Sequence, residues 1–147
     1  MEDIKILLVD DEEDFIVSIS ELLDLRDLKS KTALNGKDAL RYVGQNLPDI
    51  IVLDLKMPGL DGMEVLRRVK EHYPRIQVII LTGHGNDLEE GEARRLGAFD
   101  YLKKPVDIEM LVDRIRSAHR EMNKNNTMAA VAFAEAGEFE TARKIAR

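Results

Sequence analysis

The sequence Ile50-Ile51-Val52-Leu53-Asp54 sets four consecutive branched apolar residues before an acidic one. A second run, Ile6-Leu7-Leu8-Val9-Asp10, has the same form, and Val78-Ile79-Ile80-Leu81-Thr82 is a third that ends at a hydroxyl. Near-continuous apolar strands are typical of a parallel sheet that is covered on both faces. These three segments therefore predict the centre of such a sheet.

Outward from this centre, two weaker strands complete the pattern. Residues 28–34 are polar, and residues 99–102 form a short strand candidate. Apolar residues at helical spacing follow four of the strands, and a polar helix candidate follows the other, so five strands alternate with five helices. This alternation predicts an α/β fold, a doubly wound five-stranded parallel sheet with helices on both faces. In the flavodoxin-like order 2-1-3-4-5, residues 28–34 lie at an edge, where a polar strand is tolerated.

The composition narrows the function classes. The 147 residues suit one domain with a short appendage. A formal net charge of −6 without a basic stripe argues against direct nucleic-acid binding. The absence of cysteine excludes thiolate zinc sites and cysteine nucleophiles. Residues 76–81 are too short to span a bilayer, and acidic residues follow Met1, so we expect a cytoplasmic protein without membrane contact.

Polar residues fall where the predicted strands end. They are Asp10, Asp11, Asp54, Thr82 and Lys104. Ligands of open α/β sheets bind at the carboxyl ends of the strands, where the strand order reverses. Because the first and third strands are neighbours in the expected order, we expect the three carboxylates to converge there.

These side chains together suggest phosphoryl chemistry. Clustered carboxylates repel one another unless a proton or a cation intervenes, and oxygen ligands favour Mg²⁺. Lys104 supplies a mobile positive charge for a phosphoryl oxygen, and Thr82 supplies a hydroxyl donor. An aspartate in such a site can itself form an aspartyl phosphate.

Simpler roles exist for each residue alone. Asp11 could cap a helix, Asp54 could cap a turn, and Lys104 could be a solvated surface charge. Other phosphate chemistries lack their motifs, since the chain has no Walker loop. Lys56 also stands where phosphatases of the haloacid-dehalogenase type need a second aspartate.

Residues 3 to about 120 resemble the receiver domain of bacterial two-component response regulators. The resemblance rests on residues 7–12, 52–62, 81–85 and 97–105, which read LLVDDE, VLDLKMPGLDG, LTGHG and GAFDYLKKP. It implies that Asp54 accepts a phosphoryl group from a sensor histidine kinase. It also implies that phosphorylation changes the surface formed by the fourth helix, the fifth strand and the fifth helix. This surface would then contact a different downstream protein target.

The resemblance assigns further roles. Asp11 and Asp54 would bind Mg²⁺ directly, with Asp10 as the other acidic residue of the metal site and the carbonyl of Lys56 as a third protein ligand. Thr82 and Tyr101 would be the switch pair. Lys104 would bind the phosphate, and its bond to Pro105 would be cis.

Such a protein is not an enzyme in the usual sense, because it catalyses only its own phosphoryl transfer and slow autodephosphorylation. Two features depart from the family pattern: Val106 stands where many members have Phe, and the expected helix 87–96 is unusually polar. Two other interpretations stay open. The chain could be a receiver fragment of a longer enhancer-binding or DNA-binding regulator, or an interaction module that is never phosphorylated.

The last residues suggest an appendage. We expect a receiver over residues 1–122, and a linker with a short helical hairpin over 123–147, because residues 123–126 form a polar break. Residues 129–142 weakly resemble part of a tetratricopeptide repeat, although one repeat cannot bury its own face. The alternative is an amphipathic extension that packs on the receiver or on a second copy, which makes a homodimer possible.

Overall fold

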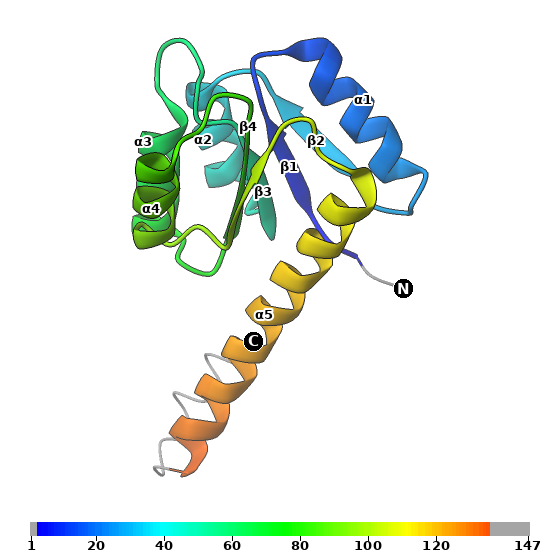
Figure 1. Ribbon diagram of the computed structural model, residues 1–147. Coiled ribbons are helices and arrows are strands. Elements are labelled where there is room, and N and C mark those ends of the chain that lie inside the picture. Colours follow the sequence, from blue (N-terminus) through cyan, green and yellow to red (C-terminus); the bar gives the residue numbers. More distant parts are fainter. Residues whose placement is uncertain (1–2, 136–147) are drawn as a thin grey trace.

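The computed structural model describes residues 3–135, with side chains from residue 3 to residue 124. Five strands alternate with five helices along the chain (Figure 1). The elements are β1 (Ile6–Val9), α1 (Glu13–Asp24), β2 (Ser30–Ala33), α2 (Gly36–Asn46), β3 (Ile50–Leu53), α3 (Gly62–His72), β4 (Gln77–Thr82), α4 (Asp87–Arg95), β5 (Asp100–Lys103) and α5 (Ile108–Glu135).

The strands form one parallel sheet in the order β2-β1-β3-β4-β5, as the sequence predicts. Val9 is in register with Leu53, and Leu53 with Ile80, so the carboxyl ends of the three central strands lie at one edge. The polar strand β2 is at the end of the sheet, and only Ala33 of its four residues is buried. The edge position expected for this strand is confirmed.

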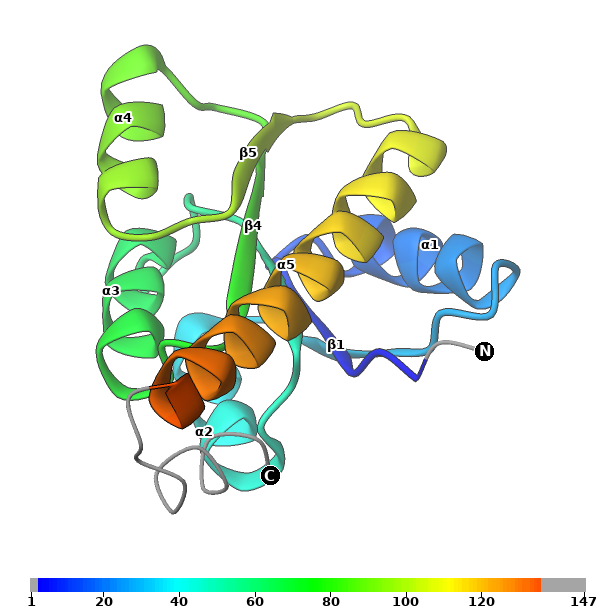
Figure 2. The same ribbon diagram turned by 90° about the horizontal axis from the view of Figure 1, so that it is seen from below.

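Helices cover both faces of the sheet (Figure 2). Alternate residues of β1 point to opposite sides, as pleated strands require. Leu7 and Val9 pack with apolar residues of α2 and α3, whereas Ile6 and Leu8 pack with those of α1 and α5. The central strands are apolar throughout because both of their faces are buried.

Side-chain caps begin three of the helices. Asn35, Asp61 and Asn86 each accept a hydrogen bond from the main-chain N–H three residues further on. These caps fix the starts of α2, α3 and α4 directly after the loops that leave the sheet.

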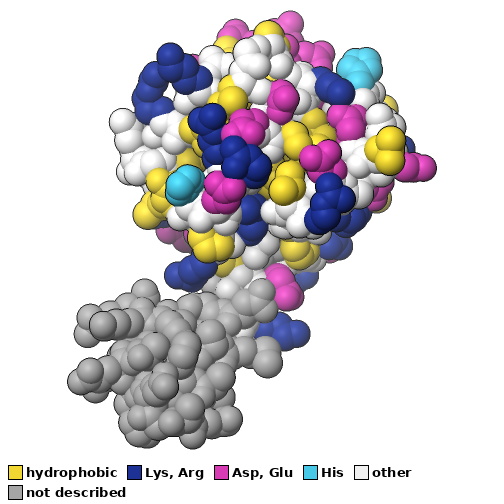
Figure 3. Space-filling model, turned by 90° about the vertical axis from the view of Figure 1, so that its left-hand side faces the viewer, with side chains coloured by type: hydrophobic (Ala, Val, Ile, Leu, Met, Phe, Trp, Pro, Cys, Tyr) yellow, Lys and Arg dark blue, Asp and Glu magenta, His cyan; other side chains and the backbone are white. Residues whose placement is uncertain are grey.

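Helix α4 is held less firmly than the others. Ala93 is the only buried residue among its nine, and Leu88 is 86% exposed. Figure 3 shows acidic and basic side chains interspersed over the face that carries α3 and α4. With little apolar surface to bury, α4 depends on polar contacts for its position.

Helix α5 corrects one expectation. The polar break expected at residues 123–126 does not interrupt it, because α5 continues to Glu135 and extends past the sheet (Figure 1). Asparagine is only a moderately poor helix former, and this segment has no Gly or Pro to stop a helix. The second helix of the expected hairpin lies outside the described residues. Within residues 3–135, no helix combines the length and the apolar character needed to cross a membrane.

Candidate functional site

The carboxyl ends of four strands bring the predicted site residues together. Asp10 follows β1, Asp54 follows β3, Thr82 ends β4, and Lys104 follows β5. Asp10, Asp54 and Thr82 are all buried. The sequence therefore predicted correctly which strand ends converge.

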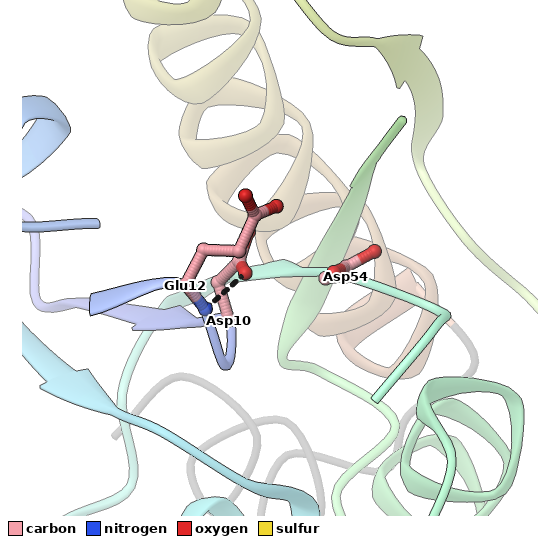
Figure 4. Close-up of side chains that lie close together, drawn as sticks. All are labelled: Asp10, Glu12 and Asp54. Carbon is pink, nitrogen blue, oxygen red and sulfur yellow. Dashed lines mark hydrogen bonds between the residues drawn. The ribbon is translucent and has the colours of Figure 1, made fainter. Parts of the chain in front are cut away.

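Three carboxylates line this site: Asp10, Glu12 and Asp54 (Figure 4). One oxygen of each lies within 4.8 Å of the others. Main-chain N–H groups hold two of them: that of Glu12 donates to Oδ1 of Asp10 at 2.9 Å, and that of Lys56 donates to Oδ1 of Asp54 at 3.2 Å. These bonds fix the direction of both buried aspartates.

Lys104 provides the positive charge of the site. Its Nζ lies 2.6 Å from Oδ2 of Asp10, 3.0 Å from Oε1 of Glu12 and 3.8 Å from Oδ2 of Asp54. The ammonium also sits 4.3 Å from the centre of the Phe15 ring, a cation–π contact. The side chain is therefore an enclosed ion-pair partner and not the solvated surface charge of the simpler interpretation.

The buried carboxylates carry an electrostatic cost. Burial raises the pKa of Asp10 above its ordinary value, and the hydrogen bond from Lys104 opposes this rise without cancelling it. Burial lowers the pKa of Lys104, but its bonds to Asp10 and Glu12 outweigh that effect and raise the pKa overall. With three carboxylates and one lysine, the site holds more negative charge than Lys104 alone neutralises.

The three acidic residues that follow β1 do not all lie where the sequence predicts. Asp11 is exposed and does not belong to the carboxylate cluster, whereas Glu12 reaches Lys104. Sequence reasoning missed Glu12, although it stands in the quoted run of three acidic residues. Only the turn after β1 decides which of the three side chains face the site.

The two residues of the expected switch pair, Thr82 and Tyr101, both border Gly85. Thr82 is fully buried, and its Oγ1 accepts a long hydrogen bond of 3.4 Å from the N–H of His84. Tyr101 is 6% exposed, so its ring points inward. Its hydroxyl has no hydrogen-bond partner of good geometry among the described residues, although the main-chain N–H of Asn86 lies near it.

Gly85 makes room for this inward tyrosine. A Cβ at position 85 would lie 1.7 Å from the hydroxyl oxygen of Tyr101, far inside van der Waals contact. Burial raises the pKa of Tyr101, and the nearby carboxylates of Glu89 and Glu90 raise it further. The neutral phenol is therefore the form that this position stabilises.

The Lys56 side chain points away from the carboxylate cluster. Its Nζ forms an ion pair with Oε2 of Glu89 on α4 at 2.8 Å. The hydrogen bond to Glu89 is the main cause of the raised pKa of Lys56. This contact joins the loop after β3 to the first turn of α4, which the sequence alone did not reveal.

The donor set fits a hard divalent cation. Carboxylate oxygens dominate the cluster within the described residues, and they are the ligands that Mg²⁺ prefers. A cation would also relieve the repulsion between two buried aspartates. The chemistry of these residues is therefore that of a magnesium site next to a lysine suited to phosphate.

A model of the response regulator receiver domain matches residues 6–116. The chain belongs to this family. This receiver is 37% identical over 112 residues to sporulation initiation phosphotransferase F of Bacillus subtilis, and the match covers 76% of this chain and 90% of that protein. It is 35% identical over 137 residues to the C4-dicarboxylate transport transcriptional regulatory protein DctD of Pseudomonas aeruginosa, which covers 92% of this chain and 30% of DctD.

Solved structures of receivers share the fold. A response regulator receiver domain protein of Clostridium thermocellum superposes with a TM-score of 0.79 at 37% identity, covering 82% of this chain and 98% of that one. NtrX of Brucella abortus gives a TM-score of 0.83 at 27% identity, covering 88% of this chain and 30% of NtrX. These matches do not support a tetratricopeptide repeat in residues 129–142, and the family model ends before them.

One further family feature is present in this receiver. The peptide bond between Lys104 and Pro105 is cis, as the resemblance implied. Receivers of two-component systems are signalling modules that interact with histidine kinases and with downstream targets.

Proposed function

We propose that this receiver takes a phosphoryl group from a histidine kinase onto Asp54, with Mg²⁺. The observation that carries the proposal is the pairing of a buried Asp54 carboxylate with Asp10 on one side and the Lys104 ammonium 3.8 Å away. Asp54 also ends a central strand, where ligands of such sheets bind.

The transfer itself needs few groups. A carboxylate oxygen of Asp54 attacks phosphorus, the phosphorus–nitrogen bond of the kinase phosphohistidine breaks, and the imidazole leaves with the electron pair. Lys104 then shifts its ammonium from Asp10 toward the new phosphoryl oxygens and offsets their charge. Thr82 supplies a hydroxyl donor at the end of the adjacent strand.

The metal would be held by the carboxylates of this site. Asp10 and Asp54 face the cluster, and the resemblance adds Asp11 and the carbonyl of Lys56. When bound, Mg²⁺ supplies positive charge that offsets the oxygens of the transferring group. Glu12, which shares Lys104 with Asp10, is free to release that lysine when the phosphoryl group arrives.

Phosphorylation would then change the surface of α4, β5 and α5. In this proposal Thr82 moves toward the phosphoryl group and Tyr101 responds to that movement, so that a downstream protein meets a different population of conformers. Beyond its own phosphoryl transfer and slow autodephosphorylation, the chain would catalyse no reaction. A homodimer is part of the proposal, and direct contact with nucleic acid is not.

A second candidate is a receiver that belongs to a longer transcriptional regulator. The match to DctD extends over 137 residues of this chain but over only 30% of DctD. In that case the same phosphoryl transfer would control domains attached to the receiver. The coding sequence around this chain distinguishes the two.

The experiment uses Mg²⁺, acetyl phosphate and intact-mass measurement. We expect the wild type to gain one phosphoryl group and Asp54→Asn to gain none. Asp113→Asn is the matched control, because it removes an exposed carboxylate on α5. Retention of the phosphoryl group by Asp54→Asn would move the acceptor elsewhere. No gain in the wild type would favour an interaction module that is never phosphorylated.

A further inference from the structure

The ion pair between Lys56 and Glu89 connects the phosphoacceptor loop to α4. Lys56 stands two residues after Asp54, and its N–H donates to the Asp54 carboxylate. Its side chain nevertheless reaches α4, where Nζ lies 2.8 Å from Oε2 of Glu89. One residue thus contacts both the acceptor, through its main chain, and α4, through its side chain.

Apart from Tyr101, whose hydroxyl lies near the main-chain N–H of Asn86, little else holds the first turn of helix α4. Its only buried side chain, Ala93, lies in the second half of the helix. Arg94, also in that half, pairs with Asp100 of β5. At the start of the helix, Leu88 projects into solvent. The Lys56 pair is therefore a principal contact between the start of α4 and the rest of the domain.

Glu89 depends on this partner. Its side chain is only 20% exposed, and its Oε1 is buried with no hydrogen-bond partner among the described residues. A partly buried carboxylate that loses its counter-charge is destabilised, because its buried part is left without a compensating partner. Departure of Lys56 would therefore favour a movement of α4 that returns Glu89 to solvent.

A phosphoryl group on Asp54 would compete for the same ammonium. It replaces the single negative charge of the carboxylate by about −1.5 to −2 and adds three acceptor oxygens at a site next to Lys56. Glu89, in contrast, holds Lys56 through a single carboxylate, and the Lys56 side chain is long and about half exposed. We propose that Glu89 is a positioning residue that draws Lys56 to α4 in the unphosphorylated receiver, and that phosphorylation releases α4 by taking Lys56 away. This inference rests on the proposed phosphorylation of Asp54.

Competition for Lys56 has a thermodynamic consequence. If the phosphoryl group and Glu89 compete for Lys56, removal of the Glu89 charge must strengthen binding of a phosphoryl mimic at Asp54. Removal of Lys56 must weaken that binding. Once Lys56 is gone, the Glu89 substitution must have no further effect, because the two residues act through one contact.

The test measures binding of beryllofluoride with Mg²⁺ by titration calorimetry. The variants are Glu89→Gln, Lys56→Met and the double variant. Glu90→Gln is the matched control, because Glu90 lies on the same helix and pairs with Arg94 instead. We expect Glu89→Gln to bind roughly 3- to 10-fold more tightly than wild type, Lys56→Met to bind more weakly, and the double variant to equal Lys56→Met.

A second measurement follows α4 directly. In Glu89→Gln without ligand, the amide resonances of residues 86–95 should shift toward their positions in the beryllofluoride complex of the wild type. Glu89→Ala should behave in the same way, which guards against a poorly folded Gln variant. These shifts should be absent in Glu90→Gln.

The outcomes separate this inference from the proposed function. If wild type binds beryllofluoride, Asp54→Asn does not, and Glu89→Gln equals wild type, the phosphoacceptor stands and the role of Glu89 is refuted. An equal gain from Glu89→Gln with and without Lys56 would also refute it. If wild type fails to bind the mimic, both the Asp54 assignment and the inference are overturned.

Discussion

Nζ of Lys104 lies closer to Asp10 than to the proposed acceptor, at 2.6 Å from the Asp10 carboxylate. The two residues are 94 positions apart in the chain, and their contact ties the loop after β5 to the end of β1. An incoming phosphoryl group must therefore break a short, enclosed ion pair before Lys104 can serve it. The pair keeps the lysine within reach of Asp54 while the site is idle.

The buried Asp10 carboxylate should cost the receiver stability at neutral pH. Its pKa is raised by burial, so the stability that Asp10 contributes is fully present below the unfolded value of 3.8 and is lost as the pH rises through the folded pKa. Without Mg²⁺, Asp10→Asn should therefore melt several degrees higher than wild type at pH 7. Asp113→Asn, at an exposed position, should melt with the wild type, and an advantage of Asp10→Asn that persists at pH 3.5 would contradict this explanation.

The three acidic residues after β1 should contribute unequally to Mg²⁺ binding. The resemblance assigns Asp11 as a direct ligand and Asp10 as one that acts through water, so Asp11→Ala should abolish Mg²⁺ affinity more fully than Asp10→Ala. Glu12→Ala should have a smaller effect, since its side chain is 65% exposed. Amide shifts during a Mg²⁺ titration measure all three. A larger loss for Glu12→Ala than for Asp11→Ala would make Asp10, Glu12 and Asp54 the ligand set.

Gly85 should be essential to the inward position of Tyr101. Gly85→Ala places a methyl group against the hydroxyl, so the ring must move outward, at a cost of about 1–3 kcal/mol for overpacking. The pKa of Tyr101 should then fall toward its ordinary value of 10.0, because burial no longer raises it. Ultraviolet titration detects this change. Gly83→Ala is the control, since a Cβ there meets only the Lys104 side chain, at 3.7 Å.

Lys56 and His84 should lengthen the life of the phosphorylated state. Both stand two residues after a site residue. In the phosphorylated state, once Lys56 has left Glu89, a long side chain at either position would crowd the water that attacks the phosphoryl group. Lys56→Ala and His84→Ala should each shorten that life by roughly 3- to 30-fold, about 0.7–2 kcal/mol in the barrier. Phosphate release at fixed Mg²⁺ measures it. Unchanged or slower release in both variants would show that neither side chain shields the acyl phosphate.

The segment after Met122 should contribute to self-association or to docking on the receiver. The sequence supplies Ala130, Phe133 and Phe139, and apolar residues of this kind are normally covered by a partner. Truncation after Met122 should change the sedimentation coefficient or lower the melting temperature. If neither changes, the segment serves only as a linker.

Sequence patterns predicted the fold well because burial on both faces leaves a strong signal. Three apolar strands ending in polar residues indicated the sheet, its order and the convergence of Asp10, Asp54, Thr82 and Lys104. The edge position of β2 was equally clear from its polar sequence, since only Ala33 of its four residues is buried.

The errors have local causes. Which of Asp11 and Glu12 faces the site depends on the dihedral angles of one turn, which composition does not encode. The pairing of Lys56 with Glu89 joins elements 33 positions apart, and neither charge is unusual for an exposed residue. The break expected at residues 123–126 failed because polarity alone does not end a helix, whereas Gly or Pro does.

Because α5 is one unbroken helix, its length determines the direction in which its distal end faces. Its 28 residues run from the proposed signalling surface to Glu135 as one rod of about 42 Å. Each residue inserted after Met122 would rotate the distal end by about 100° and advance it by about 1.5 Å, whereas an insertion of seven would nearly restore its direction. What the far end of the rod presents to a partner is therefore set by counting residues, not only by their chemistry.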